Sequence, residues 1–170
     1  TKNEKQIGSN YLEVPYMRVA NVQDGRIDLS EVKTICVQPS DLQKYRLMRD
    51  DILLTEGGDP DKLGRGSVWH NEIEDCIHQN HIFRVRANQK VIEPTFLSFL
   101  IGSRYGKRYF LKAAKQTTGI ASINMQQLKR FPTVIPSLDE QRKFTIATQE
   151  LEQQKKLAKT QLATSEALFQ

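Results

Sequence analysis

Apolar and polar residues alternate over short stretches in the first half of the chain, a pattern typical of half-buried β-strands. The stretch 81–86 shows this period of two most clearly, and 51–55 is centred on three consecutive apolar residues. Asp24-Gly25 is a strong hairpin signal after the first apolar stretch. We therefore expect strands over five ranges, namely 13–22, 34–37, 51–55, 67–69 and 81–86.

Glycine and proline interrupt this pattern between residues 56 and 66. Four Gly and one Pro fall within these eleven residues, so we expect a loop rather than a regular element. The segment lacks the Gly-x-x-x-x-Gly-Lys-Ser/Thr order of a nucleotide-binding loop. A phosphate-cradling loop of that kind is therefore not predicted here.

From Pro94 onwards the apolar spacing becomes that of helices. Pro94 suits the first turn of an apolar helix that ends near Gly102, and a second helix is expected over about 103–115. Earlier in the chain, Ser40 and Asp41 are suited to cap a short helix over 42–47.

The last part of the chain predicts one long helix. Ser137 can serve as N-cap with Glu140 three residues later, a capping box, and residues 138–170 contain neither Gly nor Pro. Before it, a short apolar strand is expected between Pro132 and Pro136. A heptad seam passes through Phe144, Ala147, Leu151, Gln154, Ala158, Gln161, Ser165 and Leu168. Five of these eight positions are small or polar, so the helix needs a partner to remain ordered.

Together these elements predict an α+β fold. We expect a globular domain with a twisted β-sheet and short helices over 11–136, followed by a long coiled-coil-type helix over 137–170. Residues 1–10 are polar and are expected to form a flexible leader. A chain of 170 residues with 38% hydrophobic content can form a modest core.

Composition restricts the compartment. The two cysteines, Cys36 and Cys76, do not suggest a disulfide framework, so a reducing cytoplasm is the expected location. No apolar run approaches the ~20 residues that a membrane-spanning helix needs. No membrane association is expected.

Charge is distributed unevenly along the chain. Residues 1–83 carry a net charge of −4, residues 84–130 carry +9 with Glu93 as their single acid, and residues 131–170 are neutral. On the predicted second helix the basic residues fall on one face, with Lys107 beside it: Arg104, Arg108, Lys112 and Lys115. These five residues are candidates for contact with nucleic-acid phosphates, and a merely solvated basic face is the alternative.

Residues suited to reading base edges lie in the predicted loops. Arg pairs with guanine and Asn or Gln pairs with adenine, and flexible loops can place them in a groove. The candidates are Lys62, Arg65, Gln79, Asn80, Gln116, Thr117 and Thr118.

Catalytic and metal chemistry are poorly supported. The group His70, Cys76, His78 and His81 fits no standard zinc spacing. A nuclease could hold Mg²⁺ with Glu56, Asp59 and Asp61, but no Glu-x-Lys or Asp-x-Lys lies nearby. No nucleophile with its base and no cofactor motif is present. We expect no metal, no cofactor and no catalytic residues.

Two stretches resemble specificity (S) subunits of type I restriction–modification systems. One is Thr-Gly-Ile-x-x-Ile-Asn at 118–124 with Phe-Pro-x-x-Ile-Pro-x-Leu-x-Glu-Gln at 131–141. The other is Pro-Tyr-x-Arg-Val-x-Asn-Val-x-Asp-Gly-x-Ile-Asp at 15–28. The resemblance covers about residues 11–170 and implies one target-recognition domain with one conserved helix.

The resemblance also implies a function. Such a subunit is not catalytic; it recognises half of a bipartite duplex DNA site and scaffolds the methyltransferase (M) and restriction (R) subunits. Its long helix would pair, in an antiparallel coiled coil, with a second recognition half or a second copy of the chain. Two alternatives stay open: a Mg²⁺-dependent nuclease domain, and an assembly module whose basic face is incidental.

Overall fold

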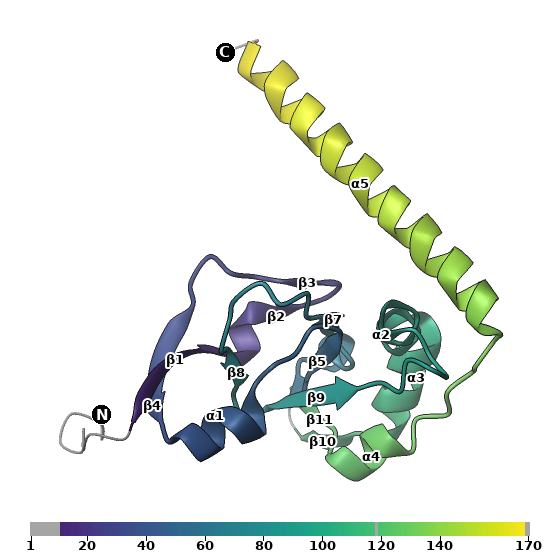
Figure 1. Ribbon diagram of the computed structural model, residues 1–170. Helices are drawn as coiled ribbons and strands as arrows, with labels where there is room; N and C mark the ends of the chain where they lie inside the picture. Colours follow the sequence, from purple (N-terminus) through teal and green to yellow (C-terminus); the bar gives the residue numbers. More distant parts are fainter. Residues whose placement is uncertain (1–10, 118, 169–170) are drawn as a thin grey trace.

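A computed structural model describes residues 11–117 and 119–168 (Figure 1). An α+β domain of short strands and helices is followed by one long helix that projects away from it. This arrangement confirms the predicted fold class. The expected leader, residues 1–10, lies outside the described residues, as does Thr118.

The strand β5 (Asp51–Thr55) lies at the centre of the domain. It pairs antiparallel with β7 (Gly66–Val68) on one side and with β9 (Ile82–Arg86) on the other, and all of its residues are buried. Because successive side chains of a strand point to opposite faces, Ile52 and Leu54 join one hydrophobic cluster and Leu53 joins another. One strand therefore contributes to both halves of the core.

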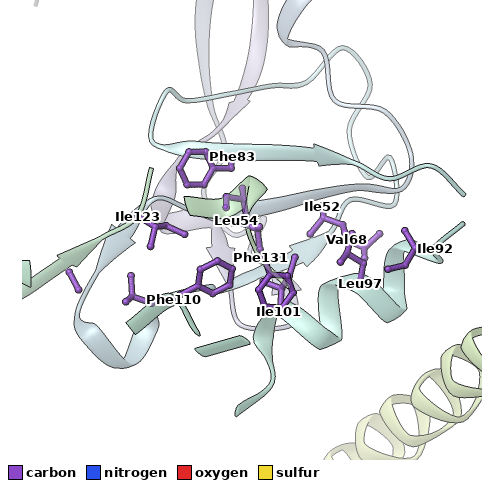
Figure 2. Close-up of a cluster of buried hydrophobic side chains, with 13 residues drawn as sticks. Ile52, Leu54, Val68, Phe83, Ile92, Leu97, Ile101, Phe110, Ile123 and Phe131 are labelled. Carbon is purple, nitrogen blue, oxygen red and sulfur yellow. The ribbon is translucent and has the colours of Figure 1, made fainter. Parts of the chain in front are cut away.

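The first cluster lies between this sheet and three helices, α2 (Pro94–Gly102), α3 (Arg104–Ala113) and α4 (Met125–Lys129) (Figure 2). At its centre Phe110 stacks on Phe131, with ring centroids 5.2 Å apart and planes 20° apart. The buried members are Ile52, Leu54, Leu63, Val68, Phe83, Ile92, Leu97, Ile101, Phe110, Ala121, Ile123, Leu128 and Phe131.

The second cluster gathers around Leu53 and Trp69 on the other side of β5. It is covered by the sheet β4–β1–β8, in which β1 (Leu12–Met17) runs antiparallel to β4 (Lys33–Val37) and parallel to β8 (Ile77–His78). The hairpin of β2 (Val22–Gln23) and β3 (Arg26–Ile27) and the helix α1 (Pro39–Tyr45) complete this side. The hairpin turns at Asp24-Gly25, as predicted, and Gly25 has φ +70°.

A third small sheet joins segments that lie far apart in the sequence. The hairpin of β10 (Lys115–Thr117) and β11 (Ile120–Ser122) pairs through β11 with β6 (Gly57–Gly58). A Cβ at Gly57 would lie 2.7 Å from the carbonyl oxygen of Ala121, so this close approach requires glycine. The loop over 56–66 is thus more ordered than predicted, because it also contains the 3-10 turn η2 (Pro60–Lys62).

Several predicted boundaries are wrong for local reasons. The first strand ends at Met17 rather than residue 22, because Val19–Asn21 form the 3-10 turn η1. The side-chain oxygen of Asn21 accepts from the Arg18 N–H at 2.9 Å and holds that turn. The short helix expected over 42–47 is α1, which begins at Pro39 without a side-chain cap.

The segment before the long helix also differs from prediction. The segment between Pro132 and Pro136 pairs with no other strand in the described part of the chain, and its residues Val134 and Ile135 are exposed. The predicted strand there is therefore wrong.

The helix α4 is not among the predicted elements, although the residues of its capping box are visible in the sequence. The N–H of Gln127 donates to Asn124 Oδ1 at 2.9 Å, and the N–H of Asn124 donates to Gln127 Oε1 at 2.7 Å.

The long helix α5 (Leu138–Leu168) begins with the predicted capping box. The Ser137 N–H donates to Glu140 Oε2 at 3.0 Å, and the Glu140 N–H donates to Ser137 Oγ at 3.4 Å. The helix packs on α2 only near its start, and every side chain from 149 to 167 is exposed. Among the described residues, none of the helices is both long and apolar enough to cross a membrane.

Candidate nucleic-acid interface

The exposed face of α3 carries three basic side chains one turn apart. Arg104, Arg108 and Lys112 are all exposed, and none of them forms an ion pair with a described residue. Each can therefore offer its charge to an external anion. The predicted stripe is present over this helix, but α3 ends at Ala113, so Lys115 lies in β10, where it is also exposed.

The opposite face of α3 fixes the helix to the core. Phe110 is fully buried, and Gly106 lies so close to α2 that a Cβ would be 2.0 Å from the carbonyl oxygen of Ile101. The Ser103 hydroxyl caps the helix by accepting from the Gly106 N–H at 3.4 Å. These contacts hold the helix backbone in place beneath the basic face.

Lys107 differs from the other basic residues of α3. It is half-buried, and its Nζ lies 2.7 Å from Asp24 Oδ2 in the β2–β3 turn. This ion pair joins α3 to the β2–β3 hairpin, and the Asp24 carboxylate offsets the charge of Lys107. The structure therefore places Lys107 in a bridging position rather than on the exposed stripe.

Three loops that are predicted to read bases meet around one concavity. The pairing of β11 with β6 brings the β10–β11 hairpin against the loop over 56–66, and the β8–β9 turn joins them through His81. The concavity has a volume of about 380 Å³. It is lined by Val19, Glu56, Gly57, Gly58, His81, Ile120 and Ser122.

The lining includes none of the described base-reading candidates, which lie on the neighbouring loops and strands and differ in exposure. Gln79 and Asn80 are exposed in the β8–β9 turn, and Gln116 is exposed in β10 with its amide donating to the Leu111 carbonyl at 3.2 Å. Lys62 is exposed and bonds the Asp59 carboxylate. Arg65 is half-buried, with Nη1 3.4 Å from Gln23 Oε1 and Nη2 3.5 Å from the Val19 carbonyl.

The remaining two candidates are Thr117 and Thr118. Thr117 ends β10, and Thr118 lies outside the described residues.

Sequence reasoning missed a pair of side chains at the rim of the concavity. His81 Nδ1 and Glu56 Oε2 are 2.8 Å apart, and the Glu56 N–H donates to the His81 carbonyl at 3.0 Å. Glu56 follows β5 and His81 precedes β9, and these strands are antiparallel neighbours. Recognising that pairing in the sequence would have placed the two residues together.

Two of the acidic loop residues, Glu56 and Asp59, are already engaged within the chain. Glu56 bonds His81, and Asp59 bonds Lys62, which lowers the pKa of the Asp59 carboxyl. In the described part of the chain, no three His, Cys, Asp or Glu side chains lie close enough together to hold a metal ion. His78 packs its ring edge-on to Tyr45, and burial lowers its pKa.

The predicted seam of α5 divides into two parts. Phe144 is half-buried and packs edge-to-face on Phe96 and Phe99 of α2, with centroids 5.5 Å and 4.7 Å away. Ala147, Leu151 and Ala158 are exposed, and other apolar side chains of α5 are exposed with them: Ile146, Leu157 and Leu162. The last seam position, Leu168, ends α5, and its side chain lies outside the described part of the chain.

The chain is thus an α+β domain in which α3 exposes three basic side chains without ion pairs among the described residues, followed by a projecting C-terminal helix. The chain belongs to the type I restriction modification DNA specificity domain family, whose model matches residues 1–165. It is 28% identical over 144 residues, 84% of this chain and 33% of the relative, to a protein named as the putative MjaX type I restriction enzyme specificity subunit of Methanocaldococcus jannaschii.

Two bacterial relatives have the same kind of name. The chain is 25% identical over 140 residues to the type I restriction enzyme EcoBI specificity subunit of Escherichia coli, covering 81% of this chain and 28% of that one. It is 24% identical over 148 residues to the StySPI specificity subunit of Salmonella potsdam, covering 86% and 32%. The chain spans about a third of the length of these curated relatives.

Proposed function

We propose that this chain is a target-recognition unit that binds duplex DNA and recognises one half of a bipartite site, without catalysing a reaction itself. The observation that carries the proposal is the exposed, unpaired basic face of α3 in a chain of the specificity-domain family. Polyanion binding requires cations without carboxylate partners, and Arg104, Arg108 and Lys112 meet that requirement.

The phosphate contacts and the base contacts are proposed to lie on different elements. The basic face of α3, continued by Lys115, holds the DNA backbone and sets the register, whereas loops around the concavity read base edges. Gln79 and Asn80 in the β8–β9 turn and Gln116 in β10 are exposed and can bond adenine. Glu56, held by His81, can accept a hydrogen bond from the amino group of cytosine.

Charge reversal on α3 tests the proposal. The variant Arg104→Glu, Arg108→Glu, Lys112→Glu should weaken binding to a random-sequence duplex by at least about tenfold. The slope of log affinity against log salt should also fall by about 0.9 for each phosphate that the variant no longer neutralises. Fluorescence anisotropy at a series of salt concentrations measures both quantities.

A matched control reverses three lysines of α5. Lys143→Glu, Lys156→Glu, Lys159→Glu makes the same change in net charge at exposed positions that lie off the predicted seam. This variant should bind with nearly the wild-type salt slope. Equal loss in both variants would assign the effect to net charge alone, and no loss in either would favour the assembly module without DNA binding.

Assembly with other subunits is the second part of the proposal. The chain spans about a third of its specificity-subunit relatives, and the exposed face of α5 offers a place for a second recognition half. We propose that α5 pairs antiparallel with an equivalent helix, and that the pair scaffolds a methyltransferase subunit and, through it, a restriction subunit. The assembly would act in the cytoplasm.

The non-catalytic role has its own test. DNA cleavage by the purified chain with Mg²⁺ would overturn the non-catalytic role.

A further inference from the structure

The side chain of Gln141, in the first turn of α5, is completely buried. A buried amide is costly unless its hydrogen bonds are made. The Gln141 Oε1 accepts from the Glu93 N–H at 2.8 Å, and its Nε2 donates to the carbonyls of Val91 at 3.1 Å and Pro136 at 2.8 Å. These backbone partners fix which end of the amide is oxygen, because an N–H only donates and a carbonyl only accepts.

The three partners come from both sides of one junction. Val91 and Glu93 belong to the segment that enters α2, and Pro136 belongs to the segment that enters α5. A single side chain therefore ties together the starts of two helices. A hydrocarbon side chain of the same size would fill the space but leave an N–H and two carbonyls without their partner.

Few other contacts hold the direction of α5. Phe144 packs on Phe96 and Phe99, and Arg142 Nε lies 3.7 Å from Glu93 Oε1. Every side chain from 149 to 167 is exposed. Figure 1 shows the helix projecting away from the domain beyond its start.

We propose that Gln141 is a positioning residue that fixes the direction of α5 relative to the recognition domain. The consequence of this role for DNA rests on the proposed function. In a pair of such helices, the direction of α5 would set the separation of the two half-sites that the domains read. The helix is about 46 Å long, so a tilt of about 10° at its base moves its far end by about 8 Å. That displacement exceeds two steps of about 3.4 Å along DNA.

The direction of the helix can be measured without DNA. Spin labels on the exposed native Cys36 and on Ala163→Cys report the distance from the domain to the far part of α5. Dilution with unlabelled chain removes distances between chains. With Gln141 the distance distribution should be narrow, and in Gln141→Leu it should become roughly twice as wide.

Two further variants make this test decisive. Gln149→Leu, at an exposed position two turns later, is the matched control and should leave the width unchanged. Gln141→Glu keeps the acceptor for Glu93 but loses both donations, so it should broaden the distribution as well. An unchanged width in a folded Gln141→Leu chain would overturn the proposal; if that variant fails to fold, the width in Gln141→Glu decides.

The DNA measurement separates this inference from the proposed function. On duplexes with two half-sites at varied spacing, the wild-type chain should prefer one spacing, and Gln141→Leu should reduce that preference by about tenfold. Its affinity for a single half-site should not change, which a general loss of structure could not produce. If no variant binds DNA, the proposed function fails while the label distances still decide the role of Gln141.

Discussion

At the scale of single residues, the buried carboxylate of Asp51 depends on Arg86. Asp51 is fully buried, and Arg86 bonds both of its oxygens at 2.7 Å, while the Met48 N–H donates to Oδ2 at 2.8 Å. Hydrogen bonding to Asp51 raises the pKa of Arg86. Removing the guanidinium leaves a buried charge with one backbone donor.

We predict that Arg86→Met lowers the free energy of unfolding by about 2 kcal/mol, the usual scale for hydrogen bonds to a charged group. The value is below that of a fully buried pair, because the Arg86 side chain is 47% exposed. Urea denaturation followed by circular dichroism measures it. The double variant Asp51→Asn, Arg86→Met removes the buried charge and should recover part of the loss; a single variant as stable as wild type would contradict the prediction.

The two thiols are predicted to differ sharply in reactivity. Burial raises the pKa of Cys76 to about 12, whereas Cys36 is exposed in β4. At pH 8 only about one Cys76 side chain in 10,000 is then the reactive thiolate. Ellman's reagent should titrate one thiol in the folded chain and the second only in denaturant. Equal rates for both thiols in the folded chain would show that the second cluster opens readily.

At the scale of elements, the start of α5 is sensitive to acid. Hydrogen bonds from Ser137 lower the pKa of Glu140 below its ordinary value. A carboxyl with a depressed pKa in the folded state stabilises the fold fully above its unfolded pKa, and this contribution disappears as the pH falls through the lower folded value.

We predict that the difference in thermal stability between the wild-type chain and Glu140→Gln is constant above the ordinary Glu pKa of about 4.3 and shrinks below it. Other carboxylates titrate in both chains, so the difference isolates the capping box. Thermal unfolding followed at 222 nm over a range of pH measures it. A difference that does not change with pH would mean that the Glu140 charge adds nothing to the cap.

Local signals in the sequence predicted the elements that depend on local contacts. The capping box at Ser137 and Glu140, the Asp24-Gly25 turn and the helix beginning at Pro94 all form as expected, because each is decided by a few neighbouring residues. The same reasoning identified the basic face of α3 from the spacing of Arg104, Arg108 and Lys112.

Contacts between distant segments were not accessible in this way. The β6–β11 pairing joins residues 57–58 to 121–122, and the Glu56–His81 pair joins two strand ends. The buried hydrogen bonds of Gln141 reach back to residues 91 and 93. The sequence shows Gln141 as the last residue of the motif at 131–141 but not its role, because that role depends on which backbone groups the fold leaves unpaired beside it.

At the scale of the whole molecule, the α+β domain and the long helix α5 meet at one junction, and they can be altered separately. The two hydrophobic clusters lie within the domain and include no residue of α5. Substitutions in the exposed part of α5 should therefore change association between chains while the domain remains folded. This separation allows the pairing proposal to be tested on the full chain.

We predict that Leu151→Glu, Ala158→Glu converts a self-associating chain to a monomer, because both residues are exposed on the predicted seam and two buried charges would face the partner helix. The matched control is Ile146→Glu, Leu157→Glu: these side chains are 55% and 57% exposed on another face of α5. Light scattering should give the monomer mass for the first variant and the wild-type mass for the control. Equal masses for all three chains would count against pairing through this seam, whereas dissociation of the control alone would place the interface on the face of Ile146 and Leu157.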